Sequence, residues 1–129
     1  MEVIVPTIRL RLTARQKIKA TAEFKRAYDR KKSSADGRLI VYACENGLTV
    51  SRLGVSVSRK NGNAVVRNRI KRMFREAFRL SQHELPKGVD FVIVPKPGAL
   101  EHSLEEWKSS LIKIANQAAK KLVPTGPPS

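Results

Sequence analysis

Residues 59–79 read RKNGNAVVRNRIKRMFREAFR and form the clearest amphipathic pattern in the chain. An α-helix brings residues three and four apart onto one side. One side is then apolar, with Val66, Ile70, Met73, Phe74, Ala77 and Leu80. The opposite side carries Asn68, Arg72, Arg75 and Arg79, with Lys71 beside them, Arg67 in the first turn and Arg69 at the apolar boundary. The stretch therefore predicts a helix with one face for a core and the other for an anion.

The start of this helix also favours an anion. Asn63 is the expected N-cap, because its side-chain oxygen can accept a free amide of the first turn, and Gly62 allows a tight turn before it. The first-turn N–H groups and the positive end of the helix dipole then face an incoming phosphate. A solvated basic face is the ordinary alternative. We favour a polyanion, because Glu76 is the single acid among eight Lys or Arg residues in 59–79.

Composition predicts one cytoplasmic nucleic-acid-binding domain. The chain has 129 residues, 41% of them hydrophobic, and a net charge of +15. Residues 1–32 and 59–82 each carry +7, so two basic blocks flank a neutral region, which favours nucleic acid or another anionic surface. We rank a membrane surface low, since the apolar helix face has the width that a core needs. We find no apolar run of 18 residues and no signal-like N-terminus.

The remaining pattern predicts an α+β domain over residues 15–122, between a basic arm at 1–14 and a flexible Pro/Gly tail at 123–129. Thr21 is expected to cap a helix that runs to about Lys31. Strands are expected at 38–44, 52–58 and 90–94, with a turn-rich break at 33–37 and a tight turn at 45–47. Ser103 and Glu106 form a capping box that opens a last helix with an apolar face.

Two groups of side chains allow two interpretations. Phe24 and Tyr28 lie four residues apart, so they either pack in a core or form a platform on which unstacked bases lie. Gly54, Ser56 and Ser58 alternate on one face of a strand. That face either leaves space for a nucleic-acid strand or is an ordinary solvent face.

We find no catalytic constellation in the sequence. His83 and His102 lie apart, and neither has clustered carboxylate partners or the spacing of metal ligands. The eleven acids form no obvious metal-binding or acid–base pair. Cys44, the single cysteine, is expected to be a buried structural thiol. If the protein takes part in a reaction, we expect it to position nucleic acid for another catalyst.

Residues 54–79, GVSVSRKNGNAVVRNRIKRMFREAFR, closely resemble the bacterial ribonuclease P protein family. The centre of the match is Arg67-Asn68-Arg69, with GNAV before it and IKR after it. The resemblance extends to Phe24, Tyr28, Tyr42 and DFVIV at 90–94, and covers roughly residues 15–120.

The resemblance implies a function. Family members are the protein subunit of a ribonucleoprotein endonuclease that removes the 5′ leader from precursor tRNA. Its RNA subunit is the catalyst and uses Mg²⁺. The implied contacts to the RNA subunit are Arg67, Asn68, Arg69, Lys71, Arg72 and Arg75. The implied leader cleft has Phe24, Tyr28, Ile40, Tyr42, Ser56 and Ser58, with Arg59, Lys60 and Lys96 at its edges. The implied partners are thus the RNA subunit and precursor tRNA, with no required protein partner.

The resemblance also implies an α+β sandwich of two layers in the order αβββαβα. Its βαβ crossover around the central helix would be left-handed, whereas general rules predict a right-handed one. An extra short strand would lie near 31–35, where the residues themselves predict a turn. Two alternatives remain from the residues alone: a ribosomal or general RNA-binding protein, and a DNA-binding module with the basic helix in a major groove.

Overall fold

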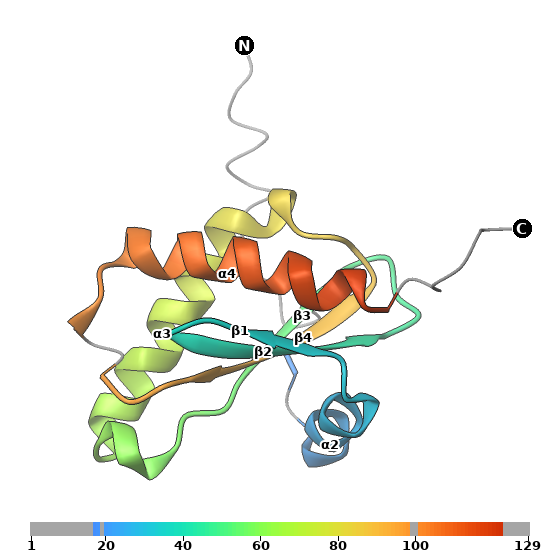
Figure 1. Cartoon of the computed structure of the whole chain (residues 1–129). Coiled ribbons are helices and arrows are strands. Elements are labelled where there is room, and N and C mark those ends of the chain that lie inside the picture. The colour runs from blue at the N-terminus through green and yellow to red at the C-terminus, as the bar shows by residue number, and fades with distance from the viewer. Residues whose placement is uncertain (1–16, 19, 99–100, 123–129) are drawn as a thin grey trace, which may run out of the picture.

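The four strands form one sheet in which their spatial order differs from their order in the chain. The computed structural model describes residues 17–18, 20–98 and 101–122. Its strands are β1 (Ser33–Ala35), β2 (Leu39–Glu45), β3 (Arg52–Val55) and β4 (Val89–Pro95), in the spatial order β1-β2-β4-β3. β4 is antiparallel to β2 and parallel to β3. The last strand in the chain thus lies between the second and the third (Figure 1).

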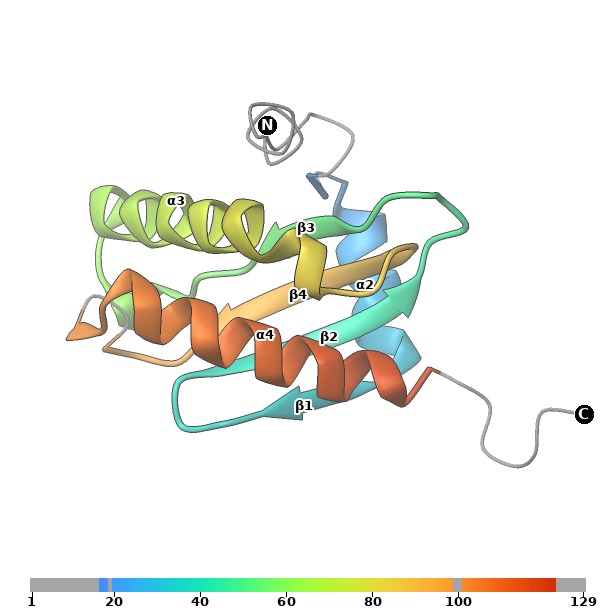
Figure 2. The same cartoon turned by 90° about the horizontal axis from the view of Figure 1, so that it is seen from above.

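The parallel pair β3 and β4 is joined through the helix α3 (Ala64–Ser81). Seen from the side of the sheet that α3 covers, with both strands pointing up, β4 lies to the left of β3 (Figure 2). The crossover is therefore left-handed, the rare hand for this connection, as the family resemblance implies. With α2 (Thr21–Arg30) and α4 (Leu104–Lys120), the order is αβββαβα, and the predicted α+β fold is confirmed.

The main core lies between the sheet and the pair α3 and α4, which cover the same face (Figure 1). β4 contributes Phe91 and Ile93, and the helices contribute fully buried aromatic side chains. The rings of Phe74 and Trp107 meet edge to face, with centroids 4.6 Å apart. On the opposite face, the shorter α2 covers part of the sheet, and it is the one helix of the described residues on that face.

Two of the three predicted helix starts are confirmed. The side chain of Asn63 accepts a hydrogen bond from the amide of Val66 at 3.0 Å. Ser103 and Glu106 form the reciprocal capping box of α4. The predicted cap at Thr21 is wrong, because α2 already includes Thr21 and Ala20 stands at its N-cap without a side-chain hydrogen bond.

Two other local expectations need correction, and one is confirmed. Residues 33–35 form β1 rather than only a turn, because they pair with β2. The strand predicted over 52–58 ends at Val55. The turn after β2 exists, with the side chain of Asn46 accepting from the Leu48 amide at 2.7 Å. It does not form a hairpin, since β4 separates the two strands that it connects.

The predicted basic arm at 1–14 and Pro/Gly tail at 123–129 lie outside the described residues. Within the described part of the chain, no helix has the length and apolar character that crossing a membrane requires.

Candidate nucleic-acid interface

The outer face of α3 is a basic surface formed by Asn68, Arg69, Lys71, Arg72 and Arg75. All of these side chains are exposed except Lys71, which is half-buried. Their orientation follows from the apolar side of the helix, where Ile70, Phe74 and Ala77 are buried in the core. Within the described residues, no acidic side chain forms an ion pair with any of the five. Their charge is thus available to a partner.

Two other basic side chains of α3 are already engaged. The Nε atom of Arg67 donates to the carbonyl oxygen of Gly62 at 3.2 Å, which draws this half-buried side chain back to the helix start. Arg79 binds Glu76 through two hydrogen bonds of 3.0 and 2.5 Å. The hydrogen bond from Arg79 lowers the pKa of Glu76, so the pair is charged and Arg79 is largely neutralised.

The turn before α3 requires glycine. Gly62 has a φ of 133°, a conformation that L side chains rarely adopt, and a Cβ atom there would lie 3.0 Å from the side chain of Val66. This turn leads from the short 3₁₀ helix η2 (Arg59–Asn61) to the cap at Asn63. The Asn63 side chain accepts a hydrogen bond from one amide of the first turn. The other amides of this turn face outward, and the neighbouring side chains of Arg59 and Lys60 are exposed.

A second surface lies on the sheet face that carries α2. Tyr28 of α2 meets Tyr42 of β2 edge to face, with ring centroids 4.8 Å apart. Phe24 lies over Gly54 of β3, where the missing side chain leaves room for its ring. The three aromatic side chains are half-buried against a small cluster of Ile18, Ala27, Cys44 and Val92. They are thus both packed and partly accessible. The two interpretations from the sequence, a core and a platform for bases, each describe only one of these properties. The predicted burial of Cys44 is confirmed.

Two further predicted cleft residues share this face. Side chains alternate along β2, so Ile40 points to the same side as Tyr42. Ser56 follows the end of β3, and its amide donates to the carbonyl of Ile93 at 2.9 Å, which keeps the chain extended beside β4. Both are half-buried. The structure therefore brings Phe24, Tyr28, Ile40, Tyr42 and Ser56 to one side of the sheet.

The four remaining predicted residues lie at the edges. Ser58, Arg59 and Lys60 are exposed in and just before η2, between the sheet and α3. Lys96 follows β4, and its Nζ atom donates to the carbonyl of Asp36 at 2.5 Å. The ammonium group of Lys96 is therefore tied to the β1–β2 connection.

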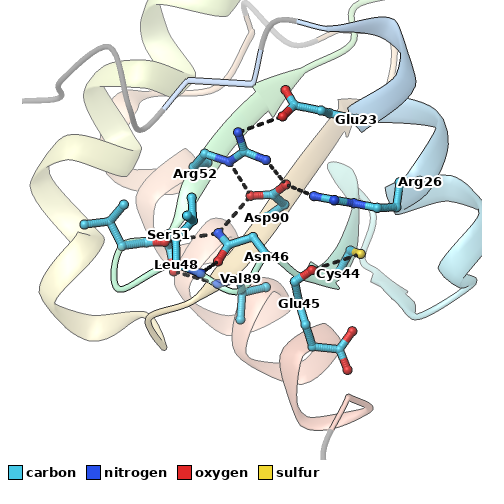
Figure 3. A network of polar contacts seen from close by, with 11 residues as sticks. Glu23, Arg26, Cys44, Glu45, Asn46, Leu48, Ser51, Arg52, Val89 and Asp90 are labelled. Carbon is cyan, nitrogen blue, oxygen red and sulfur yellow. Dashed lines mark hydrogen bonds and ion pairs between the residues drawn. The ribbon is translucent and has the colours of Figure 1, made fainter.

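Sequence reasoning missed an ionic cluster around one buried carboxylate beneath α2, formed by Glu23, Arg26, Asn46, Arg52 and Asp90 (Figure 3). Asp90 of β4 is fully buried and accepts from Arg52 at 2.8 and 2.6 Å, from Arg26 at 3.1 Å and from Asn46 at 2.9 Å. Arg52 also donates to Glu23 at 2.9 Å. The one signal in the sequence was an aspartate at the start of a strand that is otherwise apolar.

Hydrogen bonds within this cluster favour the charged forms of Glu23 and Arg52. The hydrogen bond to Asp90 is the largest cause that raises the pKa of Arg52, and the hydrogen bond from Arg52 lowers the pKa of Glu23. A buried carboxylate is stable only with such partners. We call these five residues the α2 anchor, because Glu23 and Arg26 belong to α2 and the other three belong to the sheet and its loop.

The described residues offer no metal centre, since no group of three or more His, Cys, Asp or Glu side chains could hold an ion. His83 is exposed in the 3₁₀ helix η3 (Gln82–Glu84). His102 is half-buried and stacks edge to face on Trp107, with centroids 5.2 Å apart.

A family model described as ribonuclease P matches residues 12–119, which is most of the chain. The chain belongs to the ribonuclease P protein family. The ribonuclease P protein component of Caldanaerobacter subterraneus subsp. tengcongensis is 43% identical over 98 residues, which cover 76% of this chain and 84% of that protein. That of Lachnoclostridium phytofermentans is 40% identical over 100 residues, covering 78% and 86%.

Solved structures agree with the family assignment. The ribonuclease P protein of Thermotoga maritima superposes with a TM-score of 0.72 at 30% identity, covering 78% of this chain and 96% of that one. The ribonuclease P protein of Staphylococcus aureus superposes with a TM-score of 0.68 at 35% identity, covering 77% and 91%. As a ribonuclease P protein, the chain is the RNA-binding subunit of an endonuclease that processes the 5′ end of tRNA, and its partners are the ribonuclease P RNA and precursor tRNA. In this family the RNA subunit is the catalyst.

Proposed function

We propose that this ribonuclease P protein uses two separate surfaces. The basic face of α3, with Arg67, Asn68, Arg69, Lys71, Arg72 and Arg75, binds the RNA subunit. The face beside α2, with Phe24, Tyr28, Ile40, Tyr42 and Ser56, binds the single-stranded 5′ leader. The edges of this leader-binding face carry Ser58, Arg59, Lys60 and Lys96.

The observation that carries the leader site is the half-buried state of Phe24, Tyr28 and Tyr42 on a sheet face that α3 and α4 leave uncovered. An aromatic side chain that is only packed contributes to a core, and one that is only exposed has no fixed orientation. A half-buried ring is held in place and still offers part of its surface to a base. The space above Gly54 is filled by the ring of Phe24, and the small side chain of Ser56 leaves room for a strand next to the rings.

The basic face supports the other assignment. Phosphates attract unpaired arginines, and a helix presents them at a regular spacing along one line. The exposed amides and the dipole at the start of α3 add to this attraction. We place the required Mg²⁺ with the RNA subunit, because the described residues contain no cluster of metal ligands. We also place the protein in the cytoplasm, where precursor tRNA is processed in bacteria.

Reconstitution with a bacterial ribonuclease P RNA tests the proposal. Substrates would be precursor tRNAs with leaders of increasing length, together with mature tRNA. Replacing Phe24 or Tyr28 with Ala should weaken binding of long-leader substrates by on the order of 1–3 kcal/mol and leave mature tRNA almost unchanged. Equal losses for all substrates, or a loss of thermal stability without selective loss of leader binding, would contradict the leader site.

A further inference from the structure

We propose that the α2 anchor sets the position of the leader-binding rings, and that Glu23 and Asp90 are positioning residues for the substrate although neither contacts it. This inference rests on the proposed leader site. It adds two residues with the same negative charge as RNA to the set on which leader binding depends.

The geometry of α2 is the first step. Glu23 and Phe24 are neighbours on the helix, and they meet Arg52 and Gly54 on the same strand β3. The ion pair and the ring contact thus fix α2 against β3 at two adjacent points. Three residues after Glu23, Arg26 binds Asp90 of β4 at 3.1 Å. Glu23 and Arg26 therefore hold the helix on two neighbouring strands, while Phe24 and Tyr28 meet the sheet beside them.

The strength of these contacts differs from that of ordinary surface pairs. Each of the two pairs that join α2 to the sheet has one partner shielded from water: Arg52 is 13% exposed where Glu23 is 31% exposed, and Asp90 is 1% exposed where Arg26 is 50% exposed. Water therefore screens these pairs less than a pair in which both partners are exposed. The third ionic contact of α2, between Arg30 and Glu45, has side chains that are 36% and 54% exposed. Exposed pairs contribute little to holding two elements together. The anchor, rather than the Arg30–Glu45 pair, is thus the ionic contact that fixes α2.

Few apolar contacts hold α2 on the sheet. The cluster between α2 and the sheet has four buried members, Ile18, Ala27, Cys44 and Val92, of which only Ala27 belongs to α2. The other apolar contacts of the helix in this cluster are the half-buried rings of Phe24 and Tyr28. α2 also has only ten residues, too few to be stable without such contacts. Loss of the anchor would therefore let α2 shift on the sheet, and the rings of Phe24 and Tyr28 would shift with it.

The sign of the charges gives a sharp test. Removing a carboxylate from an RNA-binding protein should strengthen binding by simple electrostatics. Glu23→Gln and Asp90→Asn should instead weaken it for substrates with a long leader, by about tenfold for Asp90→Asn and less for Glu23→Gln. Glu45→Gln is the matched control: it removes one negative charge from the exposed pair of the same helix and should not weaken binding.

The measurements use the holoenzyme reconstituted with a bacterial ribonuclease P RNA, with long-leader precursor tRNA and mature tRNA as ligands. Each variant is combined with Phe24→Ala. If the anchor acts through the ring, Glu23→Gln should have little further effect in the Phe24→Ala background. Circular dichroism and urea unfolding identify variants that are folded at the assay temperature, and Glu23→Gln, at a partly exposed side chain, keeps the test available should Asp90→Asn not fold.

Three outcomes would overturn the inference. The first is equal weakening for substrates with and without a leader. The second is full additivity of Glu23→Gln and Phe24→Ala. The third is no weakening by folded anchor variants while Phe24→Ala still lowers leader affinity, which rejects the anchor alone and keeps the leader site. If Phe24→Ala and Tyr28→Ala have no leader-selective effect, the proposed leader site fails and the role of the anchor fails with it.

Discussion

The Cζ atom of Phe24 lies 2.8 Å from the position that a Cβ atom on Gly54 would occupy. Real Cβ atoms do not approach a ring carbon this closely, so the ring rests in a space that only glycine provides. The Cβ atom of Ile18 lies 3.2 Å from the same position and closes another side of that space. The absence of a side chain at Gly54 therefore determines where an aromatic ring of α2 can lie.

Gly54→Ala should displace the ring of Phe24. We expect a loss of about 1–3 kcal/mol in the free energy of unfolding, which is the usual cost of overpacking. Urea unfolding measures this loss, and leader-selective binding should fall with it. Gly37→Ala is the control, because a Cβ atom at Gly37 meets nothing within 4 Å. Equal stability of the two variants would show that the ring moves aside without cost.

Two substitutions at Asn63 distinguish its effect on the stability of α3 from its effect on RNA binding. Asn63→Ala removes the cap and should lower the free energy of unfolding by about 1 kcal/mol. Asn63→Asp keeps a capping oxygen and should preserve stability, but its negative charge beside Arg67 and the exposed amides should weaken binding of the RNA subunit. Ser103→Ala, at the cap of α4, should lower stability to a similar extent without a selective effect on RNA. Tighter RNA binding by Asn63→Asp would contradict the assignment of this helix end.

The basic face of α3 predicts a change in salt dependence. Each phosphate contact contributes a slope of about 0.7–0.9 to the fall of log affinity with log salt concentration. Arg72→Gln should therefore flatten the slope for binding of the RNA subunit by nearly one contact. Lys113→Gln removes the same charge from an exposed position of α4 and should change the slope little. Titrations over a range of KCl concentrations compare the two, and identical slopes would remove Arg72 from the contact surface.

The Glu23–Arg52 pair predicts a contribution to acid stability. The hydrogen bond from Arg52 lowers the pKa of Glu23 below its ordinary value of 4.5. A group with a lowered pKa stabilises the folded state above its ordinary pKa and loses this effect as the pH falls through the folded value. The difference in stability between the wild type and Glu23→Gln should therefore be constant near neutral pH and shrink below pH 4.5. Urea unfolding at successive pH values measures it, and a difference that does not change with pH would exclude the pair as the cause.

Local signals in the sequence predicted the elements that depend on local contacts. The apolar spacing of α3 and α4, the caps at Asn63 and Ser103 and the buried strand β4 are all encoded within a few residues of one another. The basic face of α3 follows from the same periodicity. The prediction of its buried side omitted Phe78 and Ser81, which are both fully buried.

The remaining features depend on residues far apart in the chain. β1 has three residues and becomes a strand only by pairing with β2. Arg52 and Asp90 are 38 positions apart, so no local pattern joins them in the α2 anchor. Periodicity also left two interpretations for Phe24 and Tyr28, because the same spacing serves a core and a binding surface. The family resemblance supplied β1 and the left-handed crossover, for which the residues alone gave no basis.

The place of β4 in the sheet has a consequence for biosynthesis. β3 has β4 as its strand neighbour, so among the described strands it cannot complete its pairing until residues 89–95 have left the ribosome. Before that moment the edge of β2 that later pairs with β4 is open in the β1–β2 hairpin, while α3 and its positive charge have already been synthesised. The sheet is therefore completed late, by pairing of residues that are far apart in the chain. Proteins with many such contacts of high sequence separation fold slowly. An anionic RNA that engages α3 early would reach this chain before its fold is complete.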